Sequence, residues 1–186
     1  MFVVYFFAKV VVMVYNAIYR RLDMIHVVMV EPEIPQNAGN VVRLTAAAGV
    51  KLHLVKPLGF VMEDKYLKRA GLDYWDMADI TIHESLDEFL LEHKGANMYF
   101  ASTKSAYRYD EVDYSGVEDI YILFGKETKG LPEWLLNDNY DHTIRIPMIQ
   151  GCRSLNLSNS ISIILYEAMR QRGFERLESQ GHLTEY

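Results

Sequence analysis

Three polar segments that contain glycine follow strand-like runs of the sequence, and they are the best candidates for chemistry. QNAGN (36–40) follows the run IHVVMV, FGKETKGLP (124–132) follows DIYIL, and GCRSLNLSNSIS (151–162) follows HTIRIP. Glycine lets a backbone turn sharply or approach a ligand closely. In open α/β sheets, ligands bind at the carboxyl ends of the strands. The three segments therefore predict one composite binding site.

The third segment carries more small polar side chains than a helix start needs. Five serine or asparagine residues fall within the seven positions 154–160. Asn156 is a candidate N-cap, because it precedes an apolar-striped stretch. Ser158 and Ser162 would form a small-residue row against which another backbone can pack. Ser154 precedes the helix, so we interpret it as a ligand-facing loop residue.

Several common active-site patterns are absent from the sequence. Neither the dinucleotide pattern GxGxxG nor the P-loop pattern is present. No serine sits in a GxSxG elbow, and the six histidines have no HExxH or other metal-ligand spacing. The single cysteine, Cys152, excludes an intrachain disulfide and a cysteine-based zinc site, and it favours a reducing, cytoplasmic setting. We therefore expect no metal.

The elements that would position these segments alternate between strands and helices, which predicts an α/β fold with a mostly parallel sheet. Ser85 is the expected N-cap of one helix, and Gly49 the expected stop of another. The final helix should bury a stripe that runs from Leu157 to Ala168. The predicted strands are 25–30, 50–55, 79–83, 97–102, 119–125 and 142–147, and the predicted helices are 41–48, 63–70, 85–93, 131–138 and the stretch after 156.

Length and charge limit the classes of protein. A chain of 186 residues favours one domain, and a composition of 50% hydrophobic and 24% charged residues suits a soluble globular protein. The net charge of -6 argues against binding nucleic acid through bulk charge, although a local basic patch would still allow it.

The first 23 residues are almost wholly apolar, with Lys9 near the middle of the run. They make a poor signal peptide, because no basic residue precedes the run and no small-residue cleavage site follows it. Arg20 and Arg21 would suit a membrane anchor, but the central lysine weakens that interpretation. The other readings are a natural start at Met24 or a segment packed on the domain or a partner. We expect an extension at 1–23, a domain at 24–173 and a polar tail at 174–186, with no membrane association.

The three segments resemble the sequence motifs of the SPOUT superfamily of RNA methyltransferases, in the expected order and spacing. They are EPEIPQNAGNVVRLTAAAG, LFGKETKGLP and IPMIQGCRSLNLSNSISIILYEA. PLGF, EDK and LKRAGLDYW (67–75) add a resemblance to the subfamily of tRNA (cytidine(34)-2′-O)-methyltransferases. The resemblance covers about residues 25–173.

The resemblance implies a parallel sheet flanked by helices, with the C-terminal part threaded through a loop as a trefoil knot. It also implies S-adenosylmethionine bound in the knot, a homodimer formed through the first and last helices, and the anticodon stem-loop of tRNA as substrate. The activity would be methyl transfer to the ribose 2′-hydroxyl of the wobble nucleotide, position 34.

The motifs also imply roles for individual residues. Arg43 would lie near the reacting ribose, with Ser154 and Asn156 as further catalytic positions. Ordinary explanations stay open beside these roles: a solvated helix arginine for Arg43, a plain strand residue for Ile146, core packing for Tyr166 and a helix cap for Asn156. The implied cofactor-binding positions are Ala101, Gly125, Ile146 and Ser154, and Asn37, Glu127 and Tyr166 would shape the site.

Methyl transfer to a hydroxyl needs an in-line arrangement of oxygen, carbon and sulfur, and removal of one proton. Arginine is a poor base at its normal pKa, so Arg43 would position a phosphate or stabilise the developing alkoxide unless it is strongly perturbed. RNA affinity would come from local charge, namely Arg43, Lys51, Lys56, Lys65, Lys68, Arg69, Lys126, Lys129 and Arg153.

Two other functions stay open at this point. One is a non-catalytic RNA-binding dimer of the same fold. The other is 2′-O-methylation of a different RNA such as ribosomal RNA, although such enzymes often carry an extra RNA-binding domain.

Overall fold

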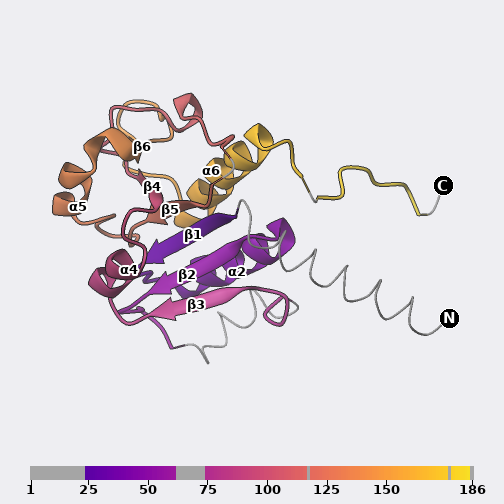
Figure 1. Ribbon diagram of the computed structural model, residues 1–186, viewed down its shortest axis with the longest axis horizontal. Helices are drawn as coiled ribbons and strands as arrows, with labels where there is room; N and C mark the ends of the chain where they lie inside the picture. Colours follow the sequence, from indigo (N-terminus) through magenta and orange to yellow (C-terminus); the bar gives the residue numbers. More distant parts are fainter. Residues whose placement is uncertain (1–23, 62–73, 117, 176, 185–186) are drawn as a thin grey trace.

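The computed structural model describes residues 24–61, 74–116, 118–175 and 177–184 (Figure 1). Its centre is a six-stranded sheet in the order β3-β2-β1-β5-β4-β6, and every strand pairing is parallel. None of the helices described is long and apolar enough to span a bilayer. The strands are β1 (Ile25–Val30), β2 (Lys51–Val55), β3 (Ile80–His83), β4 (Asn97–Ala101), β5 (Ile120–Phe124) and β6 (Thr143–Ile144).

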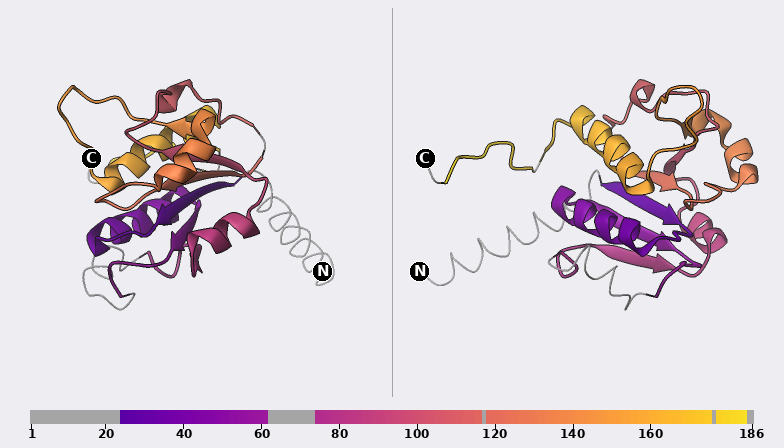
Figure 2. Two further views of the ribbon diagram at one scale, coloured as in Figure 1. Left: turned by 90° about the vertical axis from the view of Figure 1, so that its left-hand side faces the viewer. Right: turned by 180° about the vertical axis from the view of Figure 1, so that it is seen from behind.

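Helices cover both faces of the sheet (Figure 2). One apolar core lies between the sheet and the pair α2 and α6, and a second core lies on the face that α4 and α5 cover. Because both faces of the central strands are covered, β1 and β5 are buried along their whole length. The helices are α2 (Pro35–Ala48), α4 (Leu86–Glu92), α5 (Glu133–Asp138) and α6 (Leu157–Gln171), with 3-10 turns at Tyr109–Glu111 and Tyr140–His142.

The predicted α/β class with a parallel sheet is confirmed, and so are the caps at Ser85 and Gly49. Two predicted boundaries are wrong. The first helix starts at Pro35 rather than at residue 41, so QNAGN is helical and not a loop. The last strand is only Thr143–Ile144, because β6 is an edge strand that pairs with β4 alone. The predicted helix 63–70 lies outside the described residues.

Helix α6 begins and packs as its sequence indicates. The Asn156 side chain accepts a hydrogen bond from the Asn159 amide and so caps the helix. Ile161, Ile164, Leu165 and Ala168 of the predicted stripe are buried, and α6 packs on α2 and β1. The other end of α6 is tied to the loop before β5. There the Gln171 side chain donates to the Val112 carbonyl and accepts from the Tyr114 amide.

A row of three histidines, His26, His53 and His83, crosses β1, β2 and β3 beneath α4 and is buried. Nδ1 of His26 is 2.9 Å from Nε2 of His53, and Nδ1 of His53 is 2.9 Å from Nε2 of His83. His83 meets Glu92 at one end of this histidine row, and His26 faces Asp119 at the other. Burial lowers the pKa of His26 to about 4 and that of His53 to about 2, and it also lowers the pKa of His83.

The histidine row should make the fold sensitive to acid. An unfolded histidine takes up a proton near pH 6.5, whereas His26 and His53 resist protonation in the fold until pH about 4 or lower. The unfolded state therefore binds more protons below pH 6.5. The free energy of unfolding should fall by up to about 1.4 kcal/mol per pH unit for each of these histidines. Urea unfolding at pH 7.5, 6.0 and 5.0 measures this loss.

A matched control for that measurement is His142, which is exposed. His142→Gln should keep the same decline with falling pH, because this residue does not belong to the row. A free energy of unfolding that stays constant from pH 7 to pH 5 would show that the row protonates as readily in the fold as in the unfolded chain.

Candidate functional site

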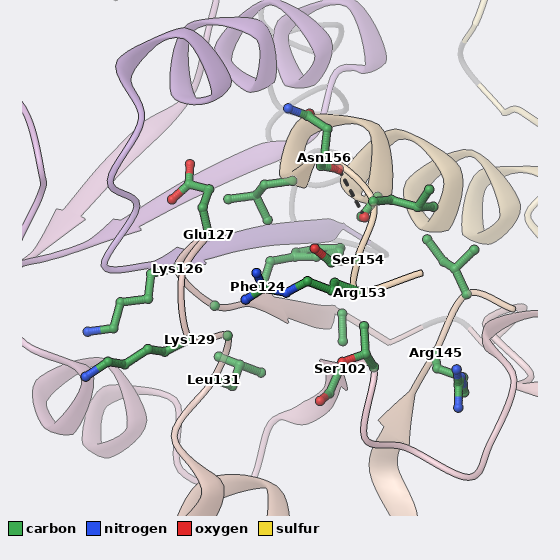
Figure 3. A pocket seen from close by; sticks show the side chains of 18 of the residues that line it. Ser102, Phe124, Lys126, Glu127, Lys129, Leu131, Arg145, Arg153, Ser154 and Asn156 are labelled. Carbon is green, nitrogen blue, oxygen red and sulfur yellow. Dashed lines mark hydrogen bonds between the residues drawn. The ribbon is translucent and has the colours of Figure 1, made fainter. Parts of the chain in front are cut away.

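A pocket of about 700 Å³ opens at the carboxyl ends of β4, β5 and β6 (Figure 3). The strand register brings Ala101 beside both Phe124 and Ile144. The Ser102 amide then donates to the Ile144 carbonyl, which holds the start of the next loop against β6. Ala101, Gly125, Ile146 and Ser154, the four implied cofactor-binding positions, all line the pocket. The structure therefore brings together residues that lie more than 50 positions apart in the chain.

Gly125 is required by the tight turn that forms one wall of the pocket. A Cβ atom on Gly125 would lie 2.0 Å from the carbonyl carbon of Gly130 and 2.1 Å from the Leu131 nitrogen. The turn is closed by a hydrogen bond from the Gly130 amide to the Lys126 carbonyl, with Gly130 at a φ of 71°. Backbone atoms cannot yield as the end of a side chain can, so any larger residue at 125 would displace the turn.

Glu127, on that turn, holds the start of α2. Its carboxylate accepts hydrogen bonds from the amides of Glu33 and Ile34 and from the side-chain amide of Asn37, the last at 2.8 Å. A helix begins with amide groups that lack partners inside the helix, and a carboxylate there also meets the positive end of the helix dipole. Glu127 thus explains why the helix can start at Pro35, far from the carboxylate in sequence.

Asn37 also forms a hydrogen bond to the third sequence segment, 151–162. Its side-chain oxygen accepts a 2.9 Å hydrogen bond from the Asn156 side chain, whose own oxygen accepts from the Ser158 hydroxyl at 2.7 Å. Asn37 is buried, while Asn156 and Ser154 are exposed at the pocket. The chain Glu127–Asn37–Asn156, hereafter the polar relay, joins all three sequence segments.

Two of the predicted site residues do not line the pocket. Arg43 is exposed in the middle of α2, and its guanidinium carbon is 4.9 Å from the centre of the Tyr74 ring. The short predicted helix had placed it in the first turn, which is wrong. Tyr166 is 44% exposed on the outer side of α6, so its explanation by core packing is also wrong. A single chain does not bring either residue to the pocket.

Some pocket residues were missed by the sequence analysis. Lys104 and Arg145 line the pocket with charge, and Met148 and Leu155 line it with apolar surface. Arg145 sits in the segment HTIRIP, which reads as a plain strand; only the pairing of β6 with β4 shows that its end faces the pocket.

The pocket can hold a small ligand that has both apolar and polar portions. Its volume is in the usual range for such ligands, and its walls combine apolar side chains with backbone groups at the strand ends. Within the described ranges, no group of three histidine, cysteine or carboxylate side chains could hold a metal ion.

Residues 24–166 match the sequence profile of the SpoU rRNA methylase family. The chain belongs to this family. One relative is the tRNA (cytidine(34)-2'-O)-methyltransferase of Methylovorus glucosotrophus, which is 46% identical over 153 residues that span 81% of this chain and 97% of the relative.

Two solved structures extend the comparison. One is described as structural insights into the 2-OH methylation of C/U34 on tRNA. It is 45% identical with a TM-score of 0.74, and the match covers 80% of this chain and 96% of that chain. The other is an AdoMet-bound rRNA methyltransferase from Sinorhizobium meliloti, which is 25% identical with a TM-score of 0.71. The match covers 79% of this chain and 56% of that chain. The α/β SpoU fold and membership of a methyltransferase family are thereby established.

Proposed function

We propose that this SpoU protein transfers a methyl group from S-adenosylmethionine to the ribose 2′-hydroxyl of the wobble nucleotide, cytidine or modified uridine at position 34 of tRNA. The support is the near-complete overlap with relatives named for this reaction, at 45% identity or more. The polar relay carries the proposal within the structure, because it holds all three sequence segments around one pocket.

S-adenosylmethionine supplies an electrophilic methyl group. We propose that the backbone at Ala101, Gly125 and Ile146 contacts its adenine, since main-chain donors and acceptors read a base edge without a particular side chain. Ser154 is exposed at the same pocket and would contact the cofactor from the third segment. The AdoMet-bound structure of the Sinorhizobium meliloti rRNA methyltransferase supports the choice of cofactor.

The role of the chain's own side chains is to position the reactants and exclude water. The Glu127 carboxylate already accepts three hydrogen bonds, so we assign it to shaping the site with Asn37 rather than to taking the hydroxyl proton. Asn156 caps α6 and presents its remaining polar surface to the pocket. We propose that Asn156 and Ser154 orient the ribose, with Arg43 beside the attacking oxygen or an RNA phosphate.

We further propose a homodimer in which α2 and α6 contribute the contact, and a trefoil knot in the C-terminal part. Exposed apolar residues on α6 support the dimer: Ile163 is 37% exposed and Tyr166 44%. The protein would act in the cytoplasm, where tRNA is processed. A stable, active monomer in sedimentation at micromolar concentration would contradict the dimer.

The proposed domain is 24–173, with 1–23 as an extension that the activity does not require and 174–186 as a tail. The family match begins at residue 24, which supports a natural start at Met24. A chain that begins at Met24 should therefore fold and methylate as the full chain does.

The reaction is tested by incubating the protein with S-adenosylmethionine and tRNA, followed by mass spectrometry of the tRNA nucleosides. We expect a 2′-O-methylated nucleoside that maps to position 34. Binding of tRNA without methyl transfer would instead support a non-catalytic RNA-binding dimer. Methylation of ribosomal RNA but not of tRNA would show that ribosomal RNA is the substrate.

A further inference from the structure

The pocket is far more basic than the chain as a whole. The chain carries a net charge of -6, yet five cations line this pocket: Lys104, Lys126, Lys129, Arg145 and Arg153. Among the described residues, the one carboxylate that lines the pocket belongs to Glu127, and it accepts three hydrogen bonds from residues at the start of α2. The site therefore attracts anions although the protein as a whole repels them.

A second hollow of about 450 Å³ adjoins the first and extends the basic surface. The two hollows share Lys104, Lys126 and Lys129, and the second also contains Glu31 and Glu133. Lys126 pairs with Glu31 and Lys104 pairs with Glu133. Each of these two lysines therefore already has a carboxylate partner.

Three cations around the joined hollows have no acidic partner within the part of the chain that the structure describes: Lys129, Arg145 and Arg153. The main chain of Arg145 is fixed at the pocket wall, because its amide donates to the Tyr107 carbonyl and its carbonyl accepts from the Tyr109 amide. Lys129 lies on one side of the pocket, Arg145 on the opposite side, and Arg153 between them (Figure 3).

The three cations lie at separate places along the pocket (Figure 3), an arrangement that suits an anion with several charges in a row. A strand with one phosphate per nucleotide is such an anion, and it can follow the three cations as it crosses the pocket mouth. Arginine also binds phosphate through two parallel hydrogen bonds. We propose that Lys129, Arg153 and Arg145 form a phosphate track, which holds the single-stranded RNA on both sides of the nucleotide that enters the pocket.

The phosphate track rests on the proposed function, because it assumes an RNA substrate, but its test separates the two. The probe is an RNA oligonucleotide with the sequence of a tRNA anticodon stem-loop. Its affinity is measured between 50 and 300 mM salt, chosen as roughly the range over which phosphate contacts weaken. The variants are Lys129→Gln, Arg145→Gln and Arg153→Gln. The control is Lys94→Gln, because Lys94 is an exposed lysine after α4, at the amino ends of the strands.

Each of the three variants should make the negative slope of log affinity against log salt shallower by about 0.7, the value for one phosphate contact to a single strand. Lys94→Gln should keep the parent slope. Arg145→Lys and Arg153→Lys should also keep it, since they retain the charge, and this excludes misfolding as the cause. Cofactor affinity by calorimetry should stay at the parent value.

Equal slopes in the parent and all three glutamine variants would overturn the phosphate track. So would a fall in cofactor affinity with an unchanged slope, because the arginines would then bind the cofactor instead. If the parent methylates the oligonucleotide while the slopes stay equal, only the track fails. If the parent neither binds nor methylates tRNA, the proposed function fails as well.

Discussion

Replacing Asn37 with aspartate should destabilise the protein by about 3 kcal/mol and slow methyl transfer roughly 100-fold. The exchange keeps the shape of the side chain but turns the amide that donates to Glu127 into a second carboxylate oxygen, at a contact that is 2.8 Å long in the parent. Two carboxylates cannot both stay ionised at that distance. The start of α2 and the placement of Asn156 would both be disturbed.

The matched control is Asn40→Asp, on the same helix. Asn40 is exposed and belongs to no part of the polar relay, so this variant adds the same charge less than one turn away. It should unfold at nearly the parent urea concentration. The Asn37→Asp defect should shrink as the pH falls, because protonating one carboxylate restores a donor between the two. Identical unfolding midpoints for the two variants would show that the polar relay contributes nothing to stability.

Changing Arg43 to lysine should lower turnover roughly 100-fold or more while leaving cofactor affinity nearly unchanged. The reason is geometric: a guanidinium grips a phosphate, or lies beside an oxyanion, through a planar fork that an ammonium lacks. A single chain leaves Arg43 over Tyr74 and outside the pocket. The predicted effect therefore depends on the proposed dimer, to which α2 contributes.

Two measurements separate the roles of Arg43. A phosphate contact predicts weaker tRNA binding with a shallower salt dependence. A purely catalytic role predicts normal tRNA binding and slow single-turnover chemistry. If Arg43→Lys and Arg43→Ala both methylate tRNA at the parent rate, Arg43 is a solvated helix arginine and has no part in the site.

The sequence predicted the strands well because burial on both faces leaves a clear signal. IHVVMV and DIYIL read as strands, and the structure buries all of IHVVMV and all of DIYIL except Asp119. The N-caps were equally readable, since Ser85 and Asn156 each precede an amphipathic stretch and act locally.

The start of α2 could not be predicted from local sequence. QNAGN has the composition of a loop, and glycine and asparagine are poor helix formers. The helix extends through it because Glu127, about 90 positions away, accepts hydrogen bonds from the amide of Glu33 just before the helix and from the Asn37 side chain in its first turn. The basic character of the pocket could not be predicted from the sequence for a related reason, because it depends on contacts between distant residues. Lys126 and Lys129 look alike in sequence, and only the structure shows that Glu31 neutralises Lys126.

The histidine row also has a direction. Its three rings and two flanking carboxylates leave four gaps, and three neutral imidazoles supply only three ring protons. The two His–His contacts of 2.9 Å are hydrogen bonds, so each must hold a proton. If His83 donates to Glu92, then His53 must donate to His83 and His26 to His53. Nε2 of His26 is then left bare toward Asp119, whose carboxylate oxygen lies 3.7 Å away. Reversing the row would move all three protons and leave His83 bare toward Glu92. The same atoms thus allow two arrangements, which differ only in which carboxylate goes without a hydrogen bond.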